Sequence, residues 1–294
     1  MPELPEVETV RIGLSKFLPG REIAAIDFDW PKSFPNAESD VKEFAVGAKI
    51  VTVERRAKVL LIELSSKYSL VIHLKMTGQL VFRSAKERFG AGHPNNSLVG
   101  ELPDKSTRVT IVFTDGSRLF FNDQRKFGWM RLLPTAEVVN LDFFKKVGPE
   151  PLAADFTWQQ MRDRLMRRKN TNIKAALLDQ TVIAGVGNIY ADEALWGAKI
   201  HPATPVSRLT APQFHKLYDE LIYVLELSIE KGGSTDRNYV DAAGKRGSYM
   251  SFARVFRREG QPCPRCGHTI EKIRVAGRGT HICPHCQKFT APKR

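Results

Sequence analysis

The chain has 294 residues, which at roughly 150 residues per domain predicts two domains with room for a small third module. A hydrophobic content of 42% and a charged content of 26% are typical of globular proteins and exclude disordered and fibrous classes. No apolar run reaches the ~18 residues of a membrane helix, and the acidic start disfavours an export signal. We therefore expect a cytoplasmic protein with no membrane partner.

The first third of the chain predicts one helix followed by strands. Apolar residues recur at helical spacing from Val7 to Phe17, and Pro19-Gly20 would end that helix. Five short β-rich runs separated by turn sequences then predict an antiparallel sandwich or barrel. These runs are residues 49–54, 59–64, 70–74, 109–113 and 118–122. Residues 83–106 have no clear periodicity, and we predict a long surface loop there.

From about residue 143 the pattern changes to helices. Thr157 is a candidate cap for a helix that contains Met161 and Leu165. Further helices are predicted over residues 174–179, 188–196 and 211–231. The polar, glycine-rich residues 232–248 are a candidate mobile loop.

Positive charge is in excess and concentrated. Lysine and arginine number 45 against 32 acidic residues, a formal charge of +13 at pH 7. Residues 254–294 hold ten of these bases against two acids, which gives +8. A second basic cluster comprises Arg162, Arg164, Arg167, Arg168, Lys169 and Lys174. Neither cluster carries the apolar helical face of a membrane anchor, so a nucleic acid is the favoured partner, with a solvated basic surface as the alternative.

All four cysteines lie close together in the sequence, as two CxxC pairs separated by sixteen residues: Cys263, Cys266, Cys283 and Cys286. Two such pairs are typical of a four-thiolate zinc site, and a reducing cytosol argues against the alternative of disulfides. Four thiolates complete a tetrahedron, so the ion would be structural. Three nearby histidines are then expected to be surface or supporting groups: His268, His281 and His285.

Two short strands, residues 270–274 and 280–282, are predicted between the cysteine pairs. They would form a hairpin around Gly277-Arg278-Gly279, with an arginine at its tip that suits contact with a phosphate. The alternative for Arg278 is an exposed turn residue.

The residues at the amino terminus could take part directly in a reaction. A small second residue normally permits removal of Met1, which would leave Pro2 with a free secondary amine. Such an amine forms a charged iminium with an aldehyde-level carbon, and Glu3 beside it could act as general acid or base. The alternative is that both residues only start a helix.

Six motifs in order resemble the formamidopyrimidine-DNA glycosylases, bacterial base-excision enzymes for oxidised purines. They are the start at Pro2-Glu3-Leu4-Pro5-Glu6, the basic turn at residues 55–58, His73-Leu74-Lys75-Met76-Thr77-Gly78, Asn122-Asp123-Gln124-Arg125-Lys126-Phe127-Gly128, Gly185-Val186-Gly187-Asn188, and the cysteine module. Residues 148–152 resemble the family's interdomain boundary. The resemblance covers essentially the whole chain.

The resemblance implies a role for each matching residue. Pro2 would attack the sugar and form a Schiff base, and Glu3 would move protons at the sugar. Lys58 would donate a proton, and Arg278 would assist δ-elimination. Met76, Arg125 and Phe127 would fill the gap left by a flipped-out base. Lys169 and Asn188 would contact phosphates, Asn188 also capping a helix.

One departure from the family is visible before the strand that starts at Val109. Ser106 stands where a DNA-contacting histidine is common, and Arg108 is a candidate replacement. Lys126 occupies a position where arginine also occurs, which keeps the charge but loses the bidentate fork.

The resemblance implies an α+β multidomain protein. We expect an N-terminal catalytic β-sandwich with a flanking helix at residues 1–134, a helix–two-turn–helix domain at 135–253 and a zinc-finger hairpin at 254–294. The partner would be double-stranded DNA with oxidised bases or abasic sites, the cofactor one structural Zn²⁺, and the enzyme a monomeric glycosylase/AP lyase. Two alternatives stay open: an endonuclease VIII-type enzyme for oxidised pyrimidines, and a non-catalytic zinc-ribbon DNA-binding protein.

Overall fold

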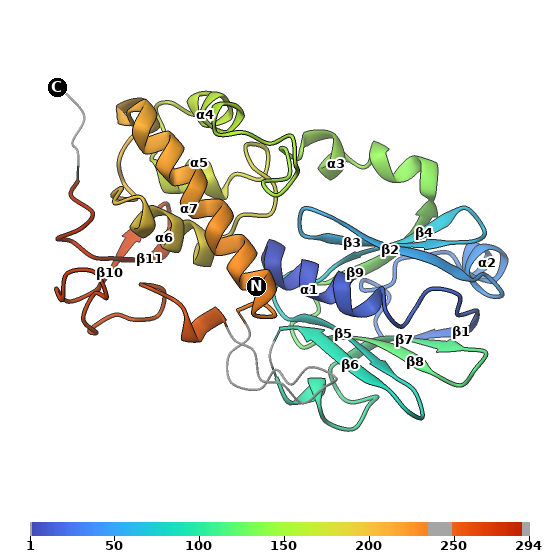
Figure 1. The fold of residues 1–294 in the computed structure, drawn as a ribbon. Coiled ribbons are helices and arrows are strands. Elements are labelled where there is room, and N and C mark those ends of the chain that lie inside the picture. Colours follow the sequence, from blue (N-terminus) through green and yellow to red (C-terminus); the bar gives the residue numbers. More distant parts are fainter. Residues whose placement is uncertain (1, 94, 235–248, 290–294) are drawn as a thin grey trace. The chain divides into compact units, whose positions relative to one another are not determined.

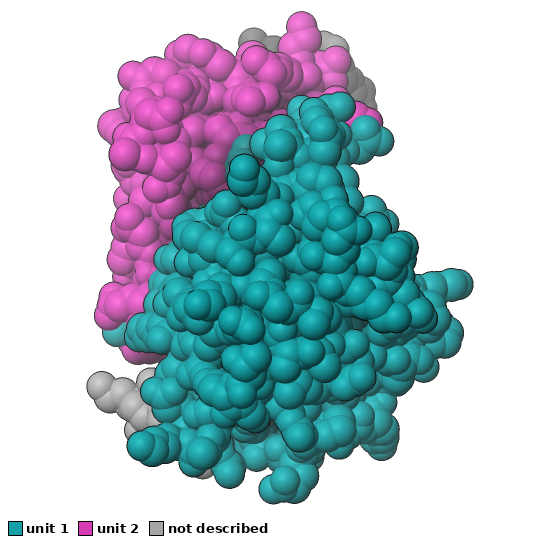
Figure 2. Space-filling model, turned by 90° about the vertical axis from the view of Figure 1, so that its right-hand side faces the viewer, with its two compact units in different colours: residues 1–145, 231–248 teal, residues 146–230, 249–294 magenta. Residues whose placement is uncertain are grey.

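The computed structural model describes residues 2–93, 95–234 and 249–289 (Figure 1). The chain forms two compact units, coloured separately in Figure 2. Unit 1 comprises residues 1–145 with 231–248, and unit 2 comprises residues 146–230 with 249–294. No helix of the described residues is long and apolar enough to cross a membrane.

Unit 1 is a helix followed by two antiparallel sheets. Helix α1 (Leu4–Leu14) comes first. One sheet has the strand order β1-β7-β8-β5-β6 and the other β2-β3-β4-β9. The strands are β1 (Ile23–Phe28), β2 (Ile50–Arg56), β3 (Val59–Leu64), β4 (Tyr68–His73), β5 (Gly78–Arg83), β6 (Arg88–Gly92), β7 (Thr107–Phe113), β8 (Arg118–Asp123) and β9 (Trp129–Pro134). The short helices are α2 (Glu38–Asp40), a π-helical turn (Val41–Ala45), two 3₁₀ turns (Asn96–Leu98, Thr135–Asn140) and α3 (Asp142–Lys146).

Both sheets contribute to one apolar core, which confirms the predicted sandwich. Leu60 and Ile62 of β3 and Leu80 and Phe82 of β5 are fully buried in the same cluster. Burying a side chain of this kind stabilises the fold by about 1.5–3 kcal/mol. All five predicted β-rich runs are strands, whereas β1, β5, β6 and β9 were not expected.

The predicted surface loop over residues 83–106 is wrong. Strand β6 lies inside it and pairs antiparallel with β5. Phe89 of β6 is buried, and its ring lies against Gly13 of α1, where an added Cβ would be 1.9 Å from the ring. Leu98 is also buried, and its side chain packs near Gly90 of β6. Strand β6 and Leu98 therefore belong to the packed body of unit 1.

Unit 2 consists of helices and one hairpin. The helices are α4 (Trp158–Met166), α5 (Ile173–Leu178), α6 (Asn188–Gly197) and α7 (Ala211–Glu230), with short 3₁₀ turns at Val206–Arg208 and Tyr249–Ser251. The hairpin is β10 (Glu271–Val275) and β11 (Arg278–Ile282). Thr157 caps α4 and accepts the backbone N–H of Gln160, as the sequence predicts. The predicted mobile loop at 232–248 lies mostly outside the described residues.

Candidate active site

The first residues of the chain are held inside unit 1. Pro2 and Glu3 are buried and lead directly into α1. The Glu6 carboxylate accepts the backbone N–H of Glu3 at 2.7 Å and that of Ser234 at 2.7 Å. Gly233 lies so close that a Cβ there would be 3.3 Å from Glu6 Cγ, and its φ of +89° suits glycine. Glu6 thus fixes the backbone at Glu3 and is itself held by the distant segment at Gly233 and Ser234.

Lys58 is buried in the two-residue turn between β2 and β3. Arg55 on β2 donates to the carbonyl of Ala57 at 2.9 Å and to the Glu8 carboxylate on α1 at 2.7 Å. Burial raises the pKa of Glu8, but hydrogen bonds from Arg11 and Arg55 bring that pKa below its ordinary value. The Glu8–Arg55 ion pair therefore ties α1 to the turn that carries Lys58.

A buried aspartate organises two further loops. Asp123 accepts the hydroxyl of Thr77 and the backbone N–H groups of Arg125 and Gly128, the latter two at 3.2 and 2.6 Å. Thr77 belongs to the turn between β4 and β5, whereas Arg125 and Gly128 belong to the loop between β8 and β9. One carboxylate therefore holds together the turn with Met76 and the loop with Arg125.

These two loops expose large apolar side chains. Met76 is 37% exposed and Phe127 is 52% exposed, so neither is a core residue. The Arg125 guanidinium lies 4.8 Å from the centre of the Phe127 ring, and the Lys126 ammonium lies 4.3 Å from the Trp30 ring. Exposed apolar groups beside cations are available for a partner that has both apolar and anionic surfaces.

His73 stabilises the turn before Met76 in its neutral form. Its Nδ1 accepts the backbone N–H of Lys75 at 3.0 Å. Burial, followed by the positive charges of Lys75 and Lys58, lowers the pKa of His73 to about 3. The imidazole is consequently an acceptor at neutral pH.

The proposed replacement for the family's histidine does not hold. Ser106 is buried, and its hydroxyl donates to Asp104 at 2.7 Å. Arg108 is also buried, and its guanidinium donates to the carbonyl of Asp123 at 3.0 Å and pairs with Asp29. Both side chains are committed to interactions within unit 1, so neither presents a surface contact.

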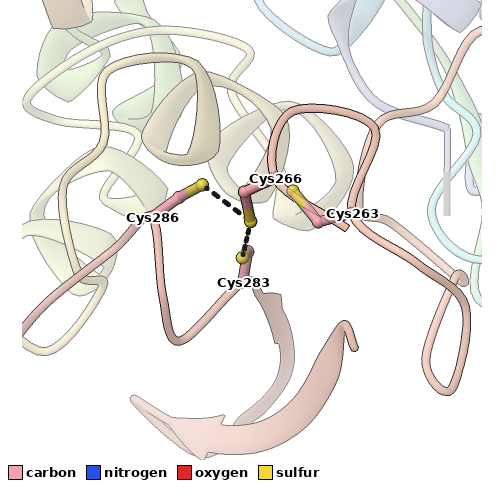
Figure 3. A group of neighbouring side chains, drawn as sticks. All are labelled: Cys263, Cys266, Cys283 and Cys286. Carbon is pink, nitrogen blue, oxygen red and sulfur yellow. Dashed lines mark hydrogen bonds between the residues drawn. The ribbon is translucent and has the colours of Figure 1, made fainter. Parts of the chain in front are cut away.

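The four cysteine side chains converge (Figure 3). Their sulfur atoms all lie within 4.8 Å of one another, and Cys266 Sγ is 3.4 Å from the Sγ atoms of both Cys283 and Cys286. A tetrahedral zinc ion with Zn–S bonds of about 2.3 Å separates its sulfurs by about 3.8 Å. The cluster therefore fits one structural zinc ion, as predicted.

The neighbouring histidines are not needed as ligands. His281 is buried, and its backbone N–H donates to Asp192 at 2.9 Å. His268 and His285 are exposed, stack with ring centres 4.1 Å apart and approach Cys266. The four thiolates already complete the tetrahedron without them.

Arg278 is the first residue of β11 and is exposed. It follows a two-residue turn, Ala276-Gly277, whose φ angles of 53° and 71° suit a tight hairpin.

Asn188 begins α6, but Gly187 is the N-cap, so the predicted capping by Asn188 is wrong. Instead its side-chain amide donates to the carbonyl of Gly279 at 3.1 Å. The glycine-rich turn and the hairpin are thereby connected. Lys169 is exposed beyond the end of α4.

The sequence places Lys174 in the second basic cluster, but in the structure this side chain does not lie at the surface. Its side chain is fully buried and donates to Asp192 Oδ1 at 2.6 Å and to Thr280 Oγ1 at 2.6 Å. Lys174 therefore joins α5 to the hairpin that carries Arg278. The other bases of that cluster, Arg162 to Lys169, lie at the surface.

Three family descriptions match the chain in order. The formamidopyrimidine-DNA glycosylase N-terminal domain matches residues 1–130, the formamidopyrimidine-DNA glycosylase H2TH domain matches residues 147–239, and the zinc finger found in FPG and IleRS matches residues 260–288. Together they agree with a sandwich, a helical region and a cysteine module in that sequence.

Relatives match over nearly the full length. The formamidopyrimidine-DNA glycosylase of Chloroflexus aurantiacus is 44% identical over 288 residues, 98% of each chain. That of Pelotomaculum thermopropionicum is 43% identical over 289 residues, 98% of this chain and 99% of the relative. A Lactococcus lactis FPG mutant solved with Fapy-dG-containing DNA superimposes with a TM-score of 0.86 at 37% identity, covering 98% of this chain and 100% of that one. Lactococcus lactis Fpg with abasic-site DNA gives 0.85 at 37% identity and the same coverage. The chain therefore belongs to the formamidopyrimidine-DNA glycosylase family.

Proposed function

We propose that this chain is a base-excision repair glycosylase that removes oxidised purines from double-stranded DNA. The observation that carries the proposal is the buried start of α1, where Glu6 fixes the backbone of Glu3 and the Glu8–Arg55 pair connects the helix to the Lys58 turn. A free proline nitrogen in such a place is a nucleophile with acid–base groups on the adjoining elements.

In the proposed reaction, the nitrogen of Pro2 bonds to the anomeric carbon of the damaged nucleotide while the glycosidic bond breaks. The base leaves with a proton that Lys58 donates. Glu3 accepts the proton that the Pro2 nitrogen loses and delivers it to the sugar ring oxygen as the ring opens. The product is an iminium between Pro2 and the opened sugar. Once that single proton has left, the nitrogen of a secondary amine has no proton left to lose, so the iminium keeps its positive charge. This is why the first position suits proline.

We further propose AP lyase activity at the same site. The iminium acidifies the adjacent sugar carbon, so a base can remove a proton there and the 3′ phosphate can leave by β-elimination. Arg278 would stabilise the second phosphate as it leaves by δ-elimination, because its guanidinium offers a bidentate fork. The zinc ion's contribution is to hold the hairpin on which Arg278 stands.

The exposed loops supply the contacts with DNA in this proposal. Met76, Arg125 and Phe127 would enter the space left by the flipped nucleotide. Lys169 and Asn188 would contact phosphates of the damaged strand. We expect a monomer with the three-part division of residues 1–134, 135–253 and 254–294, acting in the bacterial cytoplasm.

A nicking assay on duplexes with 8-oxoguanine or thymine glycol tests the proposal. The oxidised pyrimidine is included because one similar structure is a complex of Lactococcus lactis Fpg with oxidised-pyrimidine DNA. Faster cutting at 8-oxoguanine supports the purine enzyme, and faster cutting at thymine glycol supports the endonuclease VIII-type alternative. Binding without cutting supports the zinc-ribbon alternative.

Borohydride trapping tests the nucleophile. The wild-type adduct should map to Pro2, and Glu3→Gln should bind the lesion duplex but lose excision. Equal trapping by Pro2→Gly through an internal lysine would refute the assignment of Pro2.

A further inference from the structure

Three arginines stand in a row across one sheet of unit 1. Arg83 of β5 is directly opposite Arg88 of β6 and directly opposite Arg118 of β8. Directly opposed residues on neighbouring antiparallel strands project from the same face of the sheet. The three guanidinium groups therefore share one surface.

Such a row costs stability unless something compensates it, because like charges directly opposite one another repel. The nearby turn acids Glu87 and Asp115 pair with Arg21. Burial, followed by the charge of Arg88, lowers the pKa of Arg83, whereas Glu101 acts in the opposite direction. Among the described residues, Glu101 is the one acid in the lining of the pocket that contains all three arginines.

The row lines a built concavity. A pocket of about 260 Å³ is bounded by the three arginines and by Ser84, Gly100, Glu101, Leu102, Gly116 and Phe120. Phe120 is buried and forms an apolar part of the lining. Arg83 donates from Nη2 to the carbonyl of Leu98 at 2.9 Å, which fixes one side of its guanidinium. Residues of the segment for which the sequence predicts a surface loop thus form one wall of the pocket.

We propose that this pocket binds a phosphate ester. A phosphate ester offers several oxygen acceptors and negative charge (one charge in a diester, up to two in a monoester), which match the forks of adjacent guanidinium groups and offset their repulsion. Three arginines against one glutamate leave the lining cationic. The ligand is either a free nucleotide or a phosphate of a DNA backbone, which share this chemistry.

The pocket is separate from the candidate active site. Strand β5 begins at Gly78, beside the Met76 turn, and ends at Arg83 in the row. Five steps of about 3.3 Å place these ends roughly 17 Å apart. The proposal is consequently independent of the excision chemistry, and excision from a short lesion duplex should be unchanged in Arg88→Gln.

The test follows the side-chain Nε–Hε signals of the zinc-loaded protein by NMR while pyrophosphate, deoxyguanosine monophosphate or an undamaged duplex is added. Pyrophosphate should shift the signals of Arg83, Arg88 and Arg118 together. Arg88→Gln with Arg118→Gln should weaken binding at the remaining Arg83 signal by about tenfold or more. A stronger response to the mononucleotide identifies a nucleotide site, and a stronger response to the duplex identifies a DNA-backbone site.

Lys86→Gln is the matched control, because it removes one positive charge from the turn between β5 and β6 without touching the pocket lining. It should retain wild-type binding. In the absence of added anion, the unfolding temperature of the double variant should be no lower than that of wild type, because repulsion within the row is relieved. Unmoved arginine signals with all three probes, or equal weakening by Lys86→Gln, would overturn the proposal.

Discussion

Lys174 and Asp192 form an ion pair in which both side chains are 0% exposed and Nζ lies 2.6 Å from Oδ1. The pair has further partners on the zinc-module hairpin: Lys174 donates to Thr280, and Asp192 accepts the backbone N–H of His281. Helices α5 and α6 and strand β11 are therefore joined through two charges. Removal of either member would leave the other charge buried without its ion-pair partner.

Lys174→Met should lower the free energy of unfolding of unit 2 by about 3–5 kcal/mol, because the buried Asp192 carboxylate would lose its ammonium partner. Urea denaturation followed by circular dichroism measures this loss. Arg168→Gln is the control, since Arg168 pairs with Asp179 at the surface at 2.8 Å, and its removal should cost below about 1 kcal/mol. Equal losses in the two variants would contradict the buried pair's importance.

Gly13→Ala should destabilise unit 1, although alanine is the better helix former by about 1 kcal/mol. An added Cβ at Gly13 would lie 1.9 Å from the Phe89 ring, so α1 and β6 would have to separate. Overpacking of this kind costs about 1–3 kcal/mol. Thermal unfolding measures the change, and adding Phe89→Ala should make Gly13→Ala less harmful than it is alone. A stabilised single variant would show that the ring moves aside freely.

Unit 1 should become less stable as the pH is lowered, because His73 is protonated more readily in the unfolded chain. Its pKa of about 3 in the folded chain is far below the unfolded value near 6.5, so the unfolded chain binds the extra proton first. Stability is fully present above about pH 6.5 and decreases as the pH falls toward 3, by roughly 3 kcal/mol at pH 4. Denaturation of wild type and His73→Asn at several pH values checks this.

Asparagine keeps an acceptor near the position of Nδ1 but does not titrate, so this variant should lack that part of the acid sensitivity. Parallel pH profiles for the two proteins would mean that His73 is protonated in the folded state well above pH 3.

Removal of zinc should unfold the hairpin and leave the sandwich folded. The apolar cluster around the cysteines is small: Trp196, Val255, Cys263, Ile270 and Cys283. The metal must therefore supply most of the local stability. Hydrogen exchange of the β10–β11 amides should rise to that of an unfolded segment after chelation, while the amides of β3 and β4 stay protected.

Metal analysis provides the matched comparison for this prediction. Cys283→Ser should lose the ion, whereas His285→Ala should retain one zinc per chain, because the four thiolates are sufficient ligands. Loss of zinc from the histidine variant would require a different ligand set.

Local patterns explain which features the sequence could predict. The CxxC spacing indicates zinc ligation by itself. Thr157 marks the start of α4 because it caps the residues that directly follow it in the sequence. Strand β6 was missed because Gly90 and Gly92 remove the alternation of side chains by which a strand is recognised.

Residues that act across long separations carried no such signal. Lys174 reads as one more surface base because burial of a charge depends on partners more than a hundred positions away, at Thr280. Asp123 and Glu6 hold loops together through backbone N–H groups, and any sequence can supply those groups. Their roles become visible only in three dimensions.

The hydrogen bonds of Glu6 have a practical consequence for dissecting the molecule. One carboxylate oxygen accepts from residue 3 and the other from residue 234, so the sandwich is completed by chain that returns after the helices of unit 2. A fragment ending near residue 145 would contain every strand of the sandwich and still lack one of the two backbone N–H groups that hold the Glu6 carboxylate. Residues 1–145 alone should therefore fold as a sandwich whose Glu6 carboxylate is held from one side only, and a shortened version of the protein needs both segments of the discontinuous unit.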